Sequence, residues 1–494
     1  MKLSTINPAQ HKQLFLDDHA IERLSGVKRT LHQPHKCGPV LRPDRSREQI
    51  ALQSRSVPQW NSEKGIWEWW YWTSYAVPPY GKHHSTSISL VHYAVSTDGV
   101  QWETPSLGLY KWRGSEDNNI ACDPEEGHRS LYHIVRDERE EDAQRRYKGL
   151  FGARDRALGV SPDGFGWTML EVPPIPSSDE SHFTYDEISG QYLALVKHDT
   201  EWGRSVWLAT SKDFVHWTEP KLVFHSDEVD KENRRRRIRE AVENPAYLSP
   251  PIVDGTDYIA EVYQMAVMPY EGIYIGFPGL FNPAGAIPPP QMNYTGINQV
   301  ELAVSRDLVH WERVADRAVF IGVDPWDGVH YGTAQNLLCG RPHVHEGREI
   351  WIYYNAIRFR GHKELYRDVA PEFFNDTSAL CLARLRLDGF VSLDSEEEGT
   401  VVTKPFMLNG GHLYVNAEVE NGELRAEMLD AETMKPLPGL SAHQCIPLNG
   451  DHLRGHMAWK DQPSSVHEKA VRLRFVLRKA KLYAFWLEVP PTVR

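Results

Sequence analysis

Residues 211–217 read SKDFVHW, and residues 305–311 repeat the phrase almost unchanged as SRDLVHW. STDGVQW at 96–102 and SPDGFGW at 161–167 keep the serine, the aspartate and the tryptophan at the same offsets. The four tryptophans are 65, 50 and 94 residues apart, and RLRLDGF at 384–390 is a degenerate fifth copy. A constant phrase at irregular intervals indicates one supersecondary unit that recurs with loops of variable length.

Each copy has strand-like surroundings. An alternating apolar run precedes it, as in VWLATS at 206–211, and an aromatic-rich run such as IWIYYNAI at 350–357 lies further upstream. A period of two is typical of strands. The aspartate suits a tight turn, because its side chain can accept hydrogen bonds from the backbone two residues on. We interpret the phrase as the hairpin that closes a four-stranded blade, with the tryptophan packed between neighbouring sheets.

Five copies of the phrase therefore predict an all-β chain with a five-bladed β-propeller over residues 1–400. The alternative is an ordinary β-sandwich array with chance similarity. After about residue 400 the phrase is absent and two long alternating segments follow, HLYVNAEVENGELRAEMLD at 412–430 and AVRLRFVLRKAKLYAFWLE at 470–488. We expect residues 401–494 to form a C-terminal β-sandwich.

Composition narrows the class of protein. The chain has 494 residues with a net charge of −12, which disfavours nucleic acid as a partner. No apolar run of signal-peptide or membrane-spanning length occurs, so a cytoplasmic protein without a membrane partner is expected. The 16 Trp and 21 Tyr residues suit β-structure and the stacking of sugars. The odd number of cysteines without a C-x-x-C pair predicts buried free thiols at Cys37, Cys122, Cys339, Cys381 and Cys445.

SKDFVHWTEP and SRDLVHWERV resemble the hairpins of the five-bladed propeller glycoside hydrolases, the invertase, fructanase and arabinanase group. A propeller followed by a β-sandwich is similar to the layout of glycoside hydrolase family 32. The chain lacks the chemical motifs of that group: W-M-N-D-P-N near the start, R-D-P in the second blade and an E-C pair in the third. The resemblance thus implies the fold and a small carbohydrate substrate, and leaves the sugar open.

The resemblance also implies a place for the site, where the N-terminal ends of the innermost strands meet the loops between second and third strands. Cleavage of a glycosidic bond usually needs two carboxyl groups, one that donates a proton and one that acts as nucleophile or base. We predict Asp179 as the nucleophile or base and Glu261 as the acid. The predicted substrate-binding residues are Glu48, Asp123, His84, His198, Asn293, His330, Arg358 and His362.

Other interpretations stay open at this level. Acids before strands are often turn residues, and a lone histidine is more often a satisfied residue than a ligand. A related phosphorylase would need a cationic phosphate pocket, which Arg358 and Arg360 could supply. A carbohydrate-binding propeller would keep the aromatic residues without catalysis. No metal or cofactor motif is present, and the sequence leaves open a homo-oligomer, the linkage and the stereochemical outcome.

Overall fold

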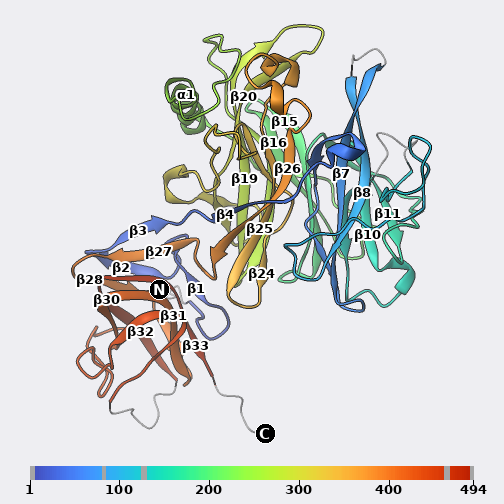
Figure 1. Ribbon diagram of the computed structural model, residues 1–494. Coiled ribbons are helices and arrows are strands. Elements are labelled where there is room, and N and C mark those ends of the chain that lie inside the picture. Colours follow the sequence, from blue (N-terminus) through green and yellow to red (C-terminus); the bar gives the residue numbers. More distant parts are fainter. Residues whose placement is uncertain (1–5, 81–84, 124–130, 461–467, 490–494) are drawn as a thin grey trace.

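The computed structural model describes residues 6–80, 85–123, 131–460 and 468–489. This part of the chain is almost entirely β-structure, as the sequence predicts, and forms two lobes, with the first and last strands in the smaller one (Figure 1). In the described residues no helix is long and apolar enough to cross a membrane. The helices are α1 (Glu228–Glu243) and the short 3-10 segments Arg45–Arg47, Ala143–Arg145, Ala315–Arg317, Lys363–Tyr366 and Pro371–Phe373.

The strands of the larger lobe pair as sheets of five, four and fourteen strands, and we divide them into five antiparallel units. Unit 1 contains β5 (Gln49–Gln53), β6 (Gln59–Asn61), β7 (Ile66–Tyr80) and β8 (Ser85–Ser96). Unit 2 contains β9 (Leu131–Arg136), β10 (Tyr147–Phe151), β11 (Arg154–Ser161), β12 (Thr168–Met169) and β13 (Ile175–Ser178). Unit 3 contains β14 (His182–Asp186), β15 (Gln191–Thr200), β16 (Gly203–Ser211) and β17 (Lys221–Phe224).

The last two units are longer. Unit 4 contains β18 (Glu261–Tyr270), β19 (Ile273–Ile287), β20 (Asn293–Val300), β21 (Ala303–Ser305) and β22 (Trp311–Arg313). Unit 5 contains β23 (Gln335–Leu338), β24 (His343–His345), β25 (Glu349–Ile357), β26 (Ser378–Arg386) and β4 (His35–Leu41). Single parallel bridges join unit 4 to unit 5 and unit 5 to unit 1.

Contacts between the units run in chain order, and the last unit meets the first. Each junction carries at least one hydrogen bond near the first strand of a unit. In order, these bonds are Ile134 N to Ser56 Oγ (2.8 Å), His133 Nε2 with Ser181 Oγ (2.7 Å), Tyr274 Oη to Asp186 Oδ2 (2.8 Å), Gln264 Nε2 to Leu338 O (2.7 Å) and Asn355 Nδ2 to Ser54 O (3.0 Å). Each unit thus contacts the next one along the chain, and the fifth contacts the first.

The repeated phrase is the turn that the sequence predicts. Asp213 Oδ1 accepts hydrogen bonds from the backbone N–H groups of Val215 (2.9 Å) and His216 (2.8 Å). Ser211 Oγ donates to the same carboxylate at 3.1 Å, and Trp217 Nε1 donates back to a carbonyl in the turn. The other three copies make the same set of bonds around Asp98, Asp163 and Asp307.

The fifth copy departs from the pattern for a topological reason. After β26 the chain turns at residues 387–390 and leaves the unit for the smaller lobe, so no tryptophan strand follows. The outer strand of unit 5 is supplied instead by β4, from the N-terminal part of the chain, which pairs antiparallel with β26. Unit 5 thus combines strands from both ends of the lobe's sequence.

The smaller lobe is one extensively paired set of strands. Its members are β1 (Gln13–Leu14), β2 (Ile21–Ser25), β3 (Lys28–Leu31), β27 (Val391–Ser395), β28 (Gly399–Thr403), β29 (Phe406–Leu408), β30 (His412–Asp430), β31 (Leu448–Met457), β32 (Lys469–Arg478) and β33 (Ala480–Glu488). The long strand β30 pairs with β33 along its first half and with β32 along its second.

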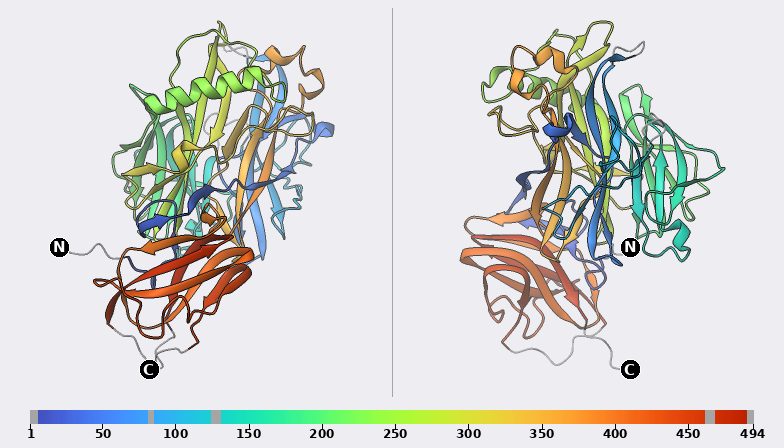
Figure 2. Two further views of the ribbon diagram at one scale, coloured as in Figure 1. Left: turned by 90° about the vertical axis from the view of Figure 1, so that its left-hand side faces the viewer. Right: turned by 45° about the vertical axis from the view of Figure 1, so that its right-hand side comes forward.

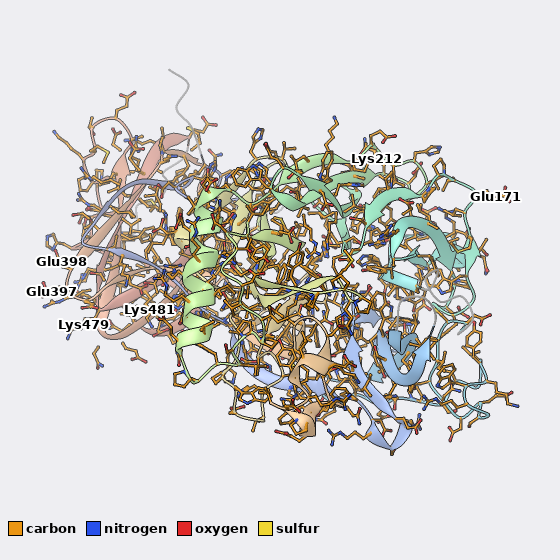
Figure 3. The ribbon with its side chains drawn as sticks, turned by 90° about the horizontal axis from the view of Figure 1, so that it is seen from above. Glu171, Lys212, Glu397, Glu398, Lys479 and Lys481 are labelled. Carbon is orange, nitrogen blue, oxygen red and sulfur yellow. The ribbon has the colours of Figure 1, made fainter. Side chains whose placement is uncertain are left out.

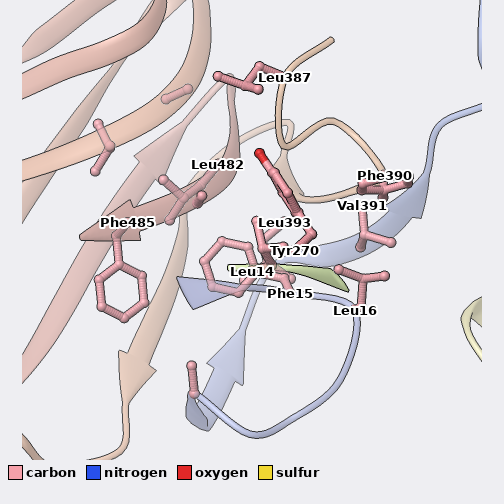
Figure 4. Packing of buried hydrophobic residues seen from close by; sticks show 14 of the residues in the cluster. Leu14, Phe15, Leu16, Tyr270, Leu387, Phe390, Val391, Leu393, Leu482 and Phe485 are labelled. Atoms are coloured by element: carbon pink, nitrogen blue, oxygen red, sulfur yellow. The ribbon is translucent and has the colours of Figure 1, made fainter. Parts of the chain in front are cut away.

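The sequence predicts one domain boundary, at residue 400. It does not predict that the N-terminal segment crosses to the smaller lobe. Strands β1, β2 and β3 pair with β33, β28 and β27, so this segment belongs to the C-terminal lobe by hydrogen bonding. Its apolar side chains explain the placement, because Leu14, Phe15 and Leu16 are buried in the core that Phe485 and Leu393 also line (Figure 4). Burial of this apolar surface stabilises the association.

Helix α1 and several exposed charged residues lie on the surface, away from the centre of the larger lobe. Helix α1 lies across its outside (Figure 2), capped by Asp227, whose side chain accepts from the backbone of Val229 and Asp230. Exposed charges lie at the two ends of the molecule, with Glu397 and Lys479 on the smaller lobe and Glu171 at the far edge of the larger one (Figure 3). All five cysteines are free thiols, and four are buried as predicted, whereas Cys37 is exposed.

Candidate functional site

Asp179 lies between β13 and β14, directly before the first strand of unit 3. Its backbone has a positive φ of 46°, and the Arg156 guanidinium donates to its carbonyl oxygen. Its carboxylate accepts a hydrogen bond from Lys197 Nζ at 3.0 Å. Burial by itself would raise the pKa of Asp179, but Lys197, with Arg55 and Arg204 nearby, lowers it below the usual value. Asp179 is therefore held as a carboxylate.

Glu261 is the first residue of β18, in the neighbouring unit 4. Its Oε2 lies 3.4 Å from Arg204 Nη1, and its side chain packs over the tight turn between β15 and β16. That turn needs Gly203, whose φ is 69°. A Cβ there would lie 3.0 Å from Glu261 Cγ and would also collide with Oε1. Absence of a side chain at Gly203 therefore leaves room for the carboxylate.

The ring of Tyr263 joins these two carboxylate sites. Lys197 Nζ lies 4.3 Å from the ring centroid, and the Arg204 guanidinium carbon lies 5.3 Å from it. Each cation also contacts one carboxylate, Lys197 that of Asp179 and Arg204 that of Glu261. Burial raises the pKa of Tyr263 to about 12, so its hydroxyl stays neutral. Two cations, each paired with one of the two carboxylates, thus lie at one aromatic ring.

Arg55 and Glu180 form the buried base of the cluster. The Glu180 carboxylate accepts two hydrogen bonds from the Arg55 guanidinium, through Nε and Nη2, and only 4% of its surface is exposed. Such a bidentate pair occupies both carboxylate oxygens. Behind it, His133 bridges the Arg55 carbonyl (2.6 Å) and Ser181 Oγ (2.7 Å), and burial lowers its pKa well below the ordinary value. This layer holds the site in place.

Arg360 completes the cluster from unit 5. Its guanidinium carbon lies 4.3 Å from the ring centroid of Phe281 and 5.5 Å from that of Tyr263. Only 6% of the residue is exposed. We call the set of Arg55, Asp179, Glu180, Lys197, Arg204, Glu261, Tyr263 and Arg360 the site cluster.

The structure brings together the two predicted catalytic residues and places the other predicted residues elsewhere. Glu48 ends a 3-10 turn with a φ of 60°, and its exposed carboxylate pairs with Arg113. Asp123 lines a cavity of about 820 Å³ beside β11, together with Arg154 and Trp167. In the described part of the chain the Glu48 carboxylate makes no bond to the site cluster, and the roles of both residues as substrate ligands stay predictions.

The predicted histidine and asparagine of units 3 and 4 serve local contacts. His198 Nε2 lies 3.1 Å from the carbonyl oxygen of Pro176, and its ring centroid lies 5.4 Å from that of Trp207. Asn293 begins β20, and its Oδ1 accepts the backbone N–H of Tyr294. His84 lies outside the described residues. Substrate contacts by these residues stay predictions.

Arg358, His330 and His362 lie in the loops of unit 5. Arg358 is buried, with Nε donating to the Asp376 carbonyl at 3.0 Å and Nη1 donating to the His330 carbonyl at 2.5 Å. The His330 ring is exposed and bonds Asp327 Oδ2 at 2.7 Å. His362 is half-buried and precedes the 3-10 segment that starts at residue 363. The observed contacts of Arg358 are with the loop itself.

Sequence reasoning missed four members of the site cluster, Arg55, Lys197, Arg204 and Tyr263. A signal for Lys197 was present, because a lysine inside the apolar strand YLALVK must either snorkel or find a partner. Arg204 and Tyr263 carried no such signal. In the described residues no group of three or more His, Cys, Asp or Glu side chains is arranged to hold a metal ion.

No family model matches the sequence. None of the curated proteins matches it either. Similar solved structures include a β-fructofuranosidase from Schwanniomyces occidentalis, 11% identical, with a TM-score of 0.41 over 97% of this chain and 98% of that chain. An α-L-arabinofuranosidase from Podospora anserina is 10% identical, with a TM-score of 0.38 over 72% of this chain and 97% of that chain.

A third similar structure is described as a glycoside hydrolase, 15% identical, with a TM-score of 0.40 over 72% of this chain and 92% of that chain. These likenesses are remote in both sequence and coordinates. The function proposed below therefore rests on the residues of the site cluster.

Proposed function

We propose that the protein is a glycoside hydrolase whose five strand units are the blades of a five-bladed propeller and whose smaller lobe is a β-sandwich. The ring of junctions between units supports the propeller, and the pairing of β30 with two partners in succession supports the sandwich. The observation that carries the function is that Asp179 and Glu261, from adjacent units, pair with two cations that share the ring of Tyr263.

The two carboxyl groups take different roles. Asp179 is held ionised by Lys197, so it acts as the nucleophile or as the base that activates water. Glu261 then delivers the proton to the leaving oxygen as the bond to the anomeric carbon breaks. The Tyr263 ring offers an apolar face against which a sugar ring can stack. Glu180 takes no part in proton transfer, because Arg55 occupies both of its oxygens.

The test is hydrolysis of a panel of nitrophenyl furanosides, pyranosides and uronides. Asp179→Asn and Glu261→Gln keep the side-chain shape and remove the proton chemistry. Each should lower kcat at least ~100-fold, the lower end of what a positioned acid or base contributes. Glu171→Gln, an exposed carboxylate at the far edge of the lobe, is the matched control and should leave kcat unchanged.

A substrate with a dinitrophenyl leaving group separates the two roles, because its departure needs no proton. It should partly restore turnover by Glu261→Gln and leave Asp179→Asn inactive. Near-normal turnover by both variants on a cleaved glycan would show that this pair is wrong. Binding of sugars without cleavage of any member of the panel would instead favour a carbohydrate-binding protein.

A further inference from the structure

Arg360 is a buried cation without a counter-ion in the described part of the chain. Its Nε has no hydrogen-bond partner, and no carboxylate lies within ion-pair distance of its guanidinium. Its neighbours are the ring faces of Phe281 and Tyr263, at 4.3 and 5.5 Å. Of the other site arginines, Arg55 bonds Glu180, and Arg204 faces Glu261. Arg360 therefore stands out as the arginine of the cluster that lacks an anion.

A buried charge without a partner is unfavourable, because it loses hydration that nothing replaces. Burial lowers the pKa of Arg360 and the positive charge of Arg204 acts in the same direction, whereas Tyr263 and Asp179 act against them. An arginine side chain nevertheless stays protonated in proteins. The rings beside it contribute cation–π attraction, which is weaker than an ion pair. The free protein thus holds a charge that an incoming anion would neutralise.

The side chains around Arg360 also carry an excess of positive charge. Three cations lie about the Tyr263 ring, with Lys197 at 4.3 Å, Arg204 at 5.3 Å and Arg360 at 5.5 Å from its centroid. They repel one another at this spacing. The carboxylates of Asp179 and Glu261 are each engaged by one of the first two cations. With both carboxyl groups ionised, the positive charge left over is that of Arg360. When Glu261 carries the proton that it donates, the excess of positive charge is larger by one.

We propose that Arg360 binds an oxyanion carried into the site with the sugar. The planar fork of a guanidinium fits a carboxylate or a phosphate through two parallel hydrogen bonds. The oxyanion has two sources, the carboxylate of a uronic acid residue and inorganic phosphate. This inference rests on the proposed function and names the class of substrate for the same site.

The two sources give two reactions with the same carboxyl groups. With a uronide, water supplies the oxygen that forms the new bond at the anomeric carbon, and Glu261 protonates the leaving oxygen. With phosphate, a phosphate oxygen forms that bond while the glycosidic oxygen leaves with the proton from Glu261. The product is then a sugar phosphate. In both cases Arg360 holds the oxyanion beside the Tyr263 ring.

Isothermal titration calorimetry on the full chain tests the proposal without turnover. The titrants are galacturonate and glucuronate, the matched neutral sugars galactose and glucose, and inorganic phosphate. We expect one oxyanion class to bind, with a uronate binding at least ~10-fold more tightly than its neutral counterpart if the carboxylate is the source. Arg360→Gln should abolish that preference, or abolish phosphate binding if phosphate is the source.

Arg367→Gln is the matched control, since Arg367 is an exposed arginine of the same loop region that lies over Phe374. It should leave oxyanion binding unchanged. Arg360→Lys keeps the charge without the fork and should retain only part of the affinity. The melting temperature of Arg360→Gln should not fall, because the change leaves no buried carboxylate unpaired.

Three results would overturn the proposal: no titrated oxyanion binds, the neutral sugars bind as tightly as the uronates while phosphate does not bind, or Arg360→Gln binds the oxyanion as well as the unmodified protein. These outcomes are distinct from failure of the proposed function. Oxyanion binding that depends on Arg360 would stand even if Asp179 and Glu261 proved not to be catalytic. Cleavage of a neutral glycoside that depends on Asp179, without oxyanion binding, would leave the hydrolase intact and refute this inference.

Discussion

Lys197 Nζ lies 3.0 Å from Asp179 Oδ2, and the two side chains differ sharply in exposure, at 4% and 54%. The lysine sits inside a strand of unit 3, whereas the aspartate stands on the loop before that unit. The cation is therefore fixed by packing, and the carboxylate that it holds faces solvent. This arrangement keeps an ionised carboxylate accessible at the edge of the site cluster.

The first prediction concerns the pH dependence of catalysis. The acid limb of the kcat/KM profile should fall below the ordinary aspartate pKa of about 3.9, because the lowered pKa keeps Asp179 ionised to lower pH. Lys197→Met removes the main counter-charge while burial persists, so the limb should move to higher pH. The measurement is kcat/KM against pH for both proteins on one nitrophenyl glycoside.

Lys212→Met, at an exposed position on the same unit, is the control and should leave the limb in place. The lowered pKa of Asp179 also determines how its ionisation changes the stability of the folded protein with pH. The Asp179 carboxylate favours the folded state above the unfolded pKa, and this contribution disappears as the pH falls through the lowered folded value. An unmoved acid limb in Lys197→Met would show that a different group sets it.

The second prediction concerns the turn below Glu261. Gly203→Ala places a Cβ against Glu261 Oε1 and adds a side chain at a φ of 69°, where the left-handed region is unfavourable for alanine. Unfolding free energy should fall by about 1–3 kcal/mol. kcat should fall at least ~10-fold, because the carboxylate must move away from its position beside Arg204. Urea denaturation and steady-state kinetics measure the two effects.

Gly190→Ala is a matched control, since it has the same φ of 69° but its nearest contact is the Tyr185 hydroxyl at 3.6 Å, remote from the site cluster. It should show the stability loss without the kinetic one. Full activity in a folded Gly203→Ala protein would mean that the observed place of Glu261 is unimportant for catalysis.

Much of the fold could be predicted because its signals are local. An Asp side chain that accepts two backbone N–H groups within three residues leaves a readable phrase, and the turn at Asp213 forms as predicted. The crossing of β1, β2 and β3 into the smaller lobe left no such phrase. Their partners lie more than 350 residues away, as Leu31 with Val391 illustrates. Pairing at that distance depends on tertiary packing rather than on local sequence.

The site cluster likewise contains some residues that the sequence could predict and others that it could not. The placement of Asp179 and Glu261 could be predicted because Asp179 lies on the loop before a first strand and Glu261 begins one, positions that the strand pattern reveals. Arg204 could not, because a cation at a strand edge looks like an ordinary surface charge, and Arg360 was predicted only as a possible phosphate ligand. Only the assembled units show that both guanidinium groups face the ring of Tyr263.

The third prediction concerns a tryptophan of the repeated phrase. Trp311 packs so closely on β19 that a Cβ at Gly276 would lie 2.7 Å from its Cζ3, and it meets Phe224 of unit 3 edge-on. Trp311→Ala should lower the unfolding free energy by about 3 kcal/mol, the lower end for tryptophan because the ring is partly exposed. Urea denaturation gives the change, and kcat of the folded fraction should stay within about two-fold.

Trp60→Ala, at a side chain that is 43% exposed, provides the comparison and should cost less than about 1 kcal/mol. A stable Trp311→Ala protein that has lost catalysis would contradict the structural role. It would indicate that the tryptophan contacts substrate.

The last prediction concerns the contact between the lobes. Asp388 is fully buried at the turn where the fifth phrase leaves unit 5, and Lys12 Nζ lies 2.9 Å from its carboxylate. Tyr270 and Asn416 also donate to Asp388, and burial raises the pKa of Tyr270, with the Asp388 charge acting in the same direction. Lys12→Met leaves the carboxylate buried without its cation, so the unfolding free energy should fall by about 3–5 kcal/mol.

The double variant Lys12→Met with Asp388→Asn removes the unpaired charge and should recover part of this loss. Asparagine is the right replacement because Asp388 has a φ of 60°, a region that asparagine tolerates. Urea denaturation followed by tryptophan fluorescence and by far-ultraviolet circular dichroism measures both proteins. A loss below about 1 kcal/mol in Lys12→Met, or a double variant less stable than the single one, would show that the ion pair does not hold the N-terminal segment against the turn at Asp388.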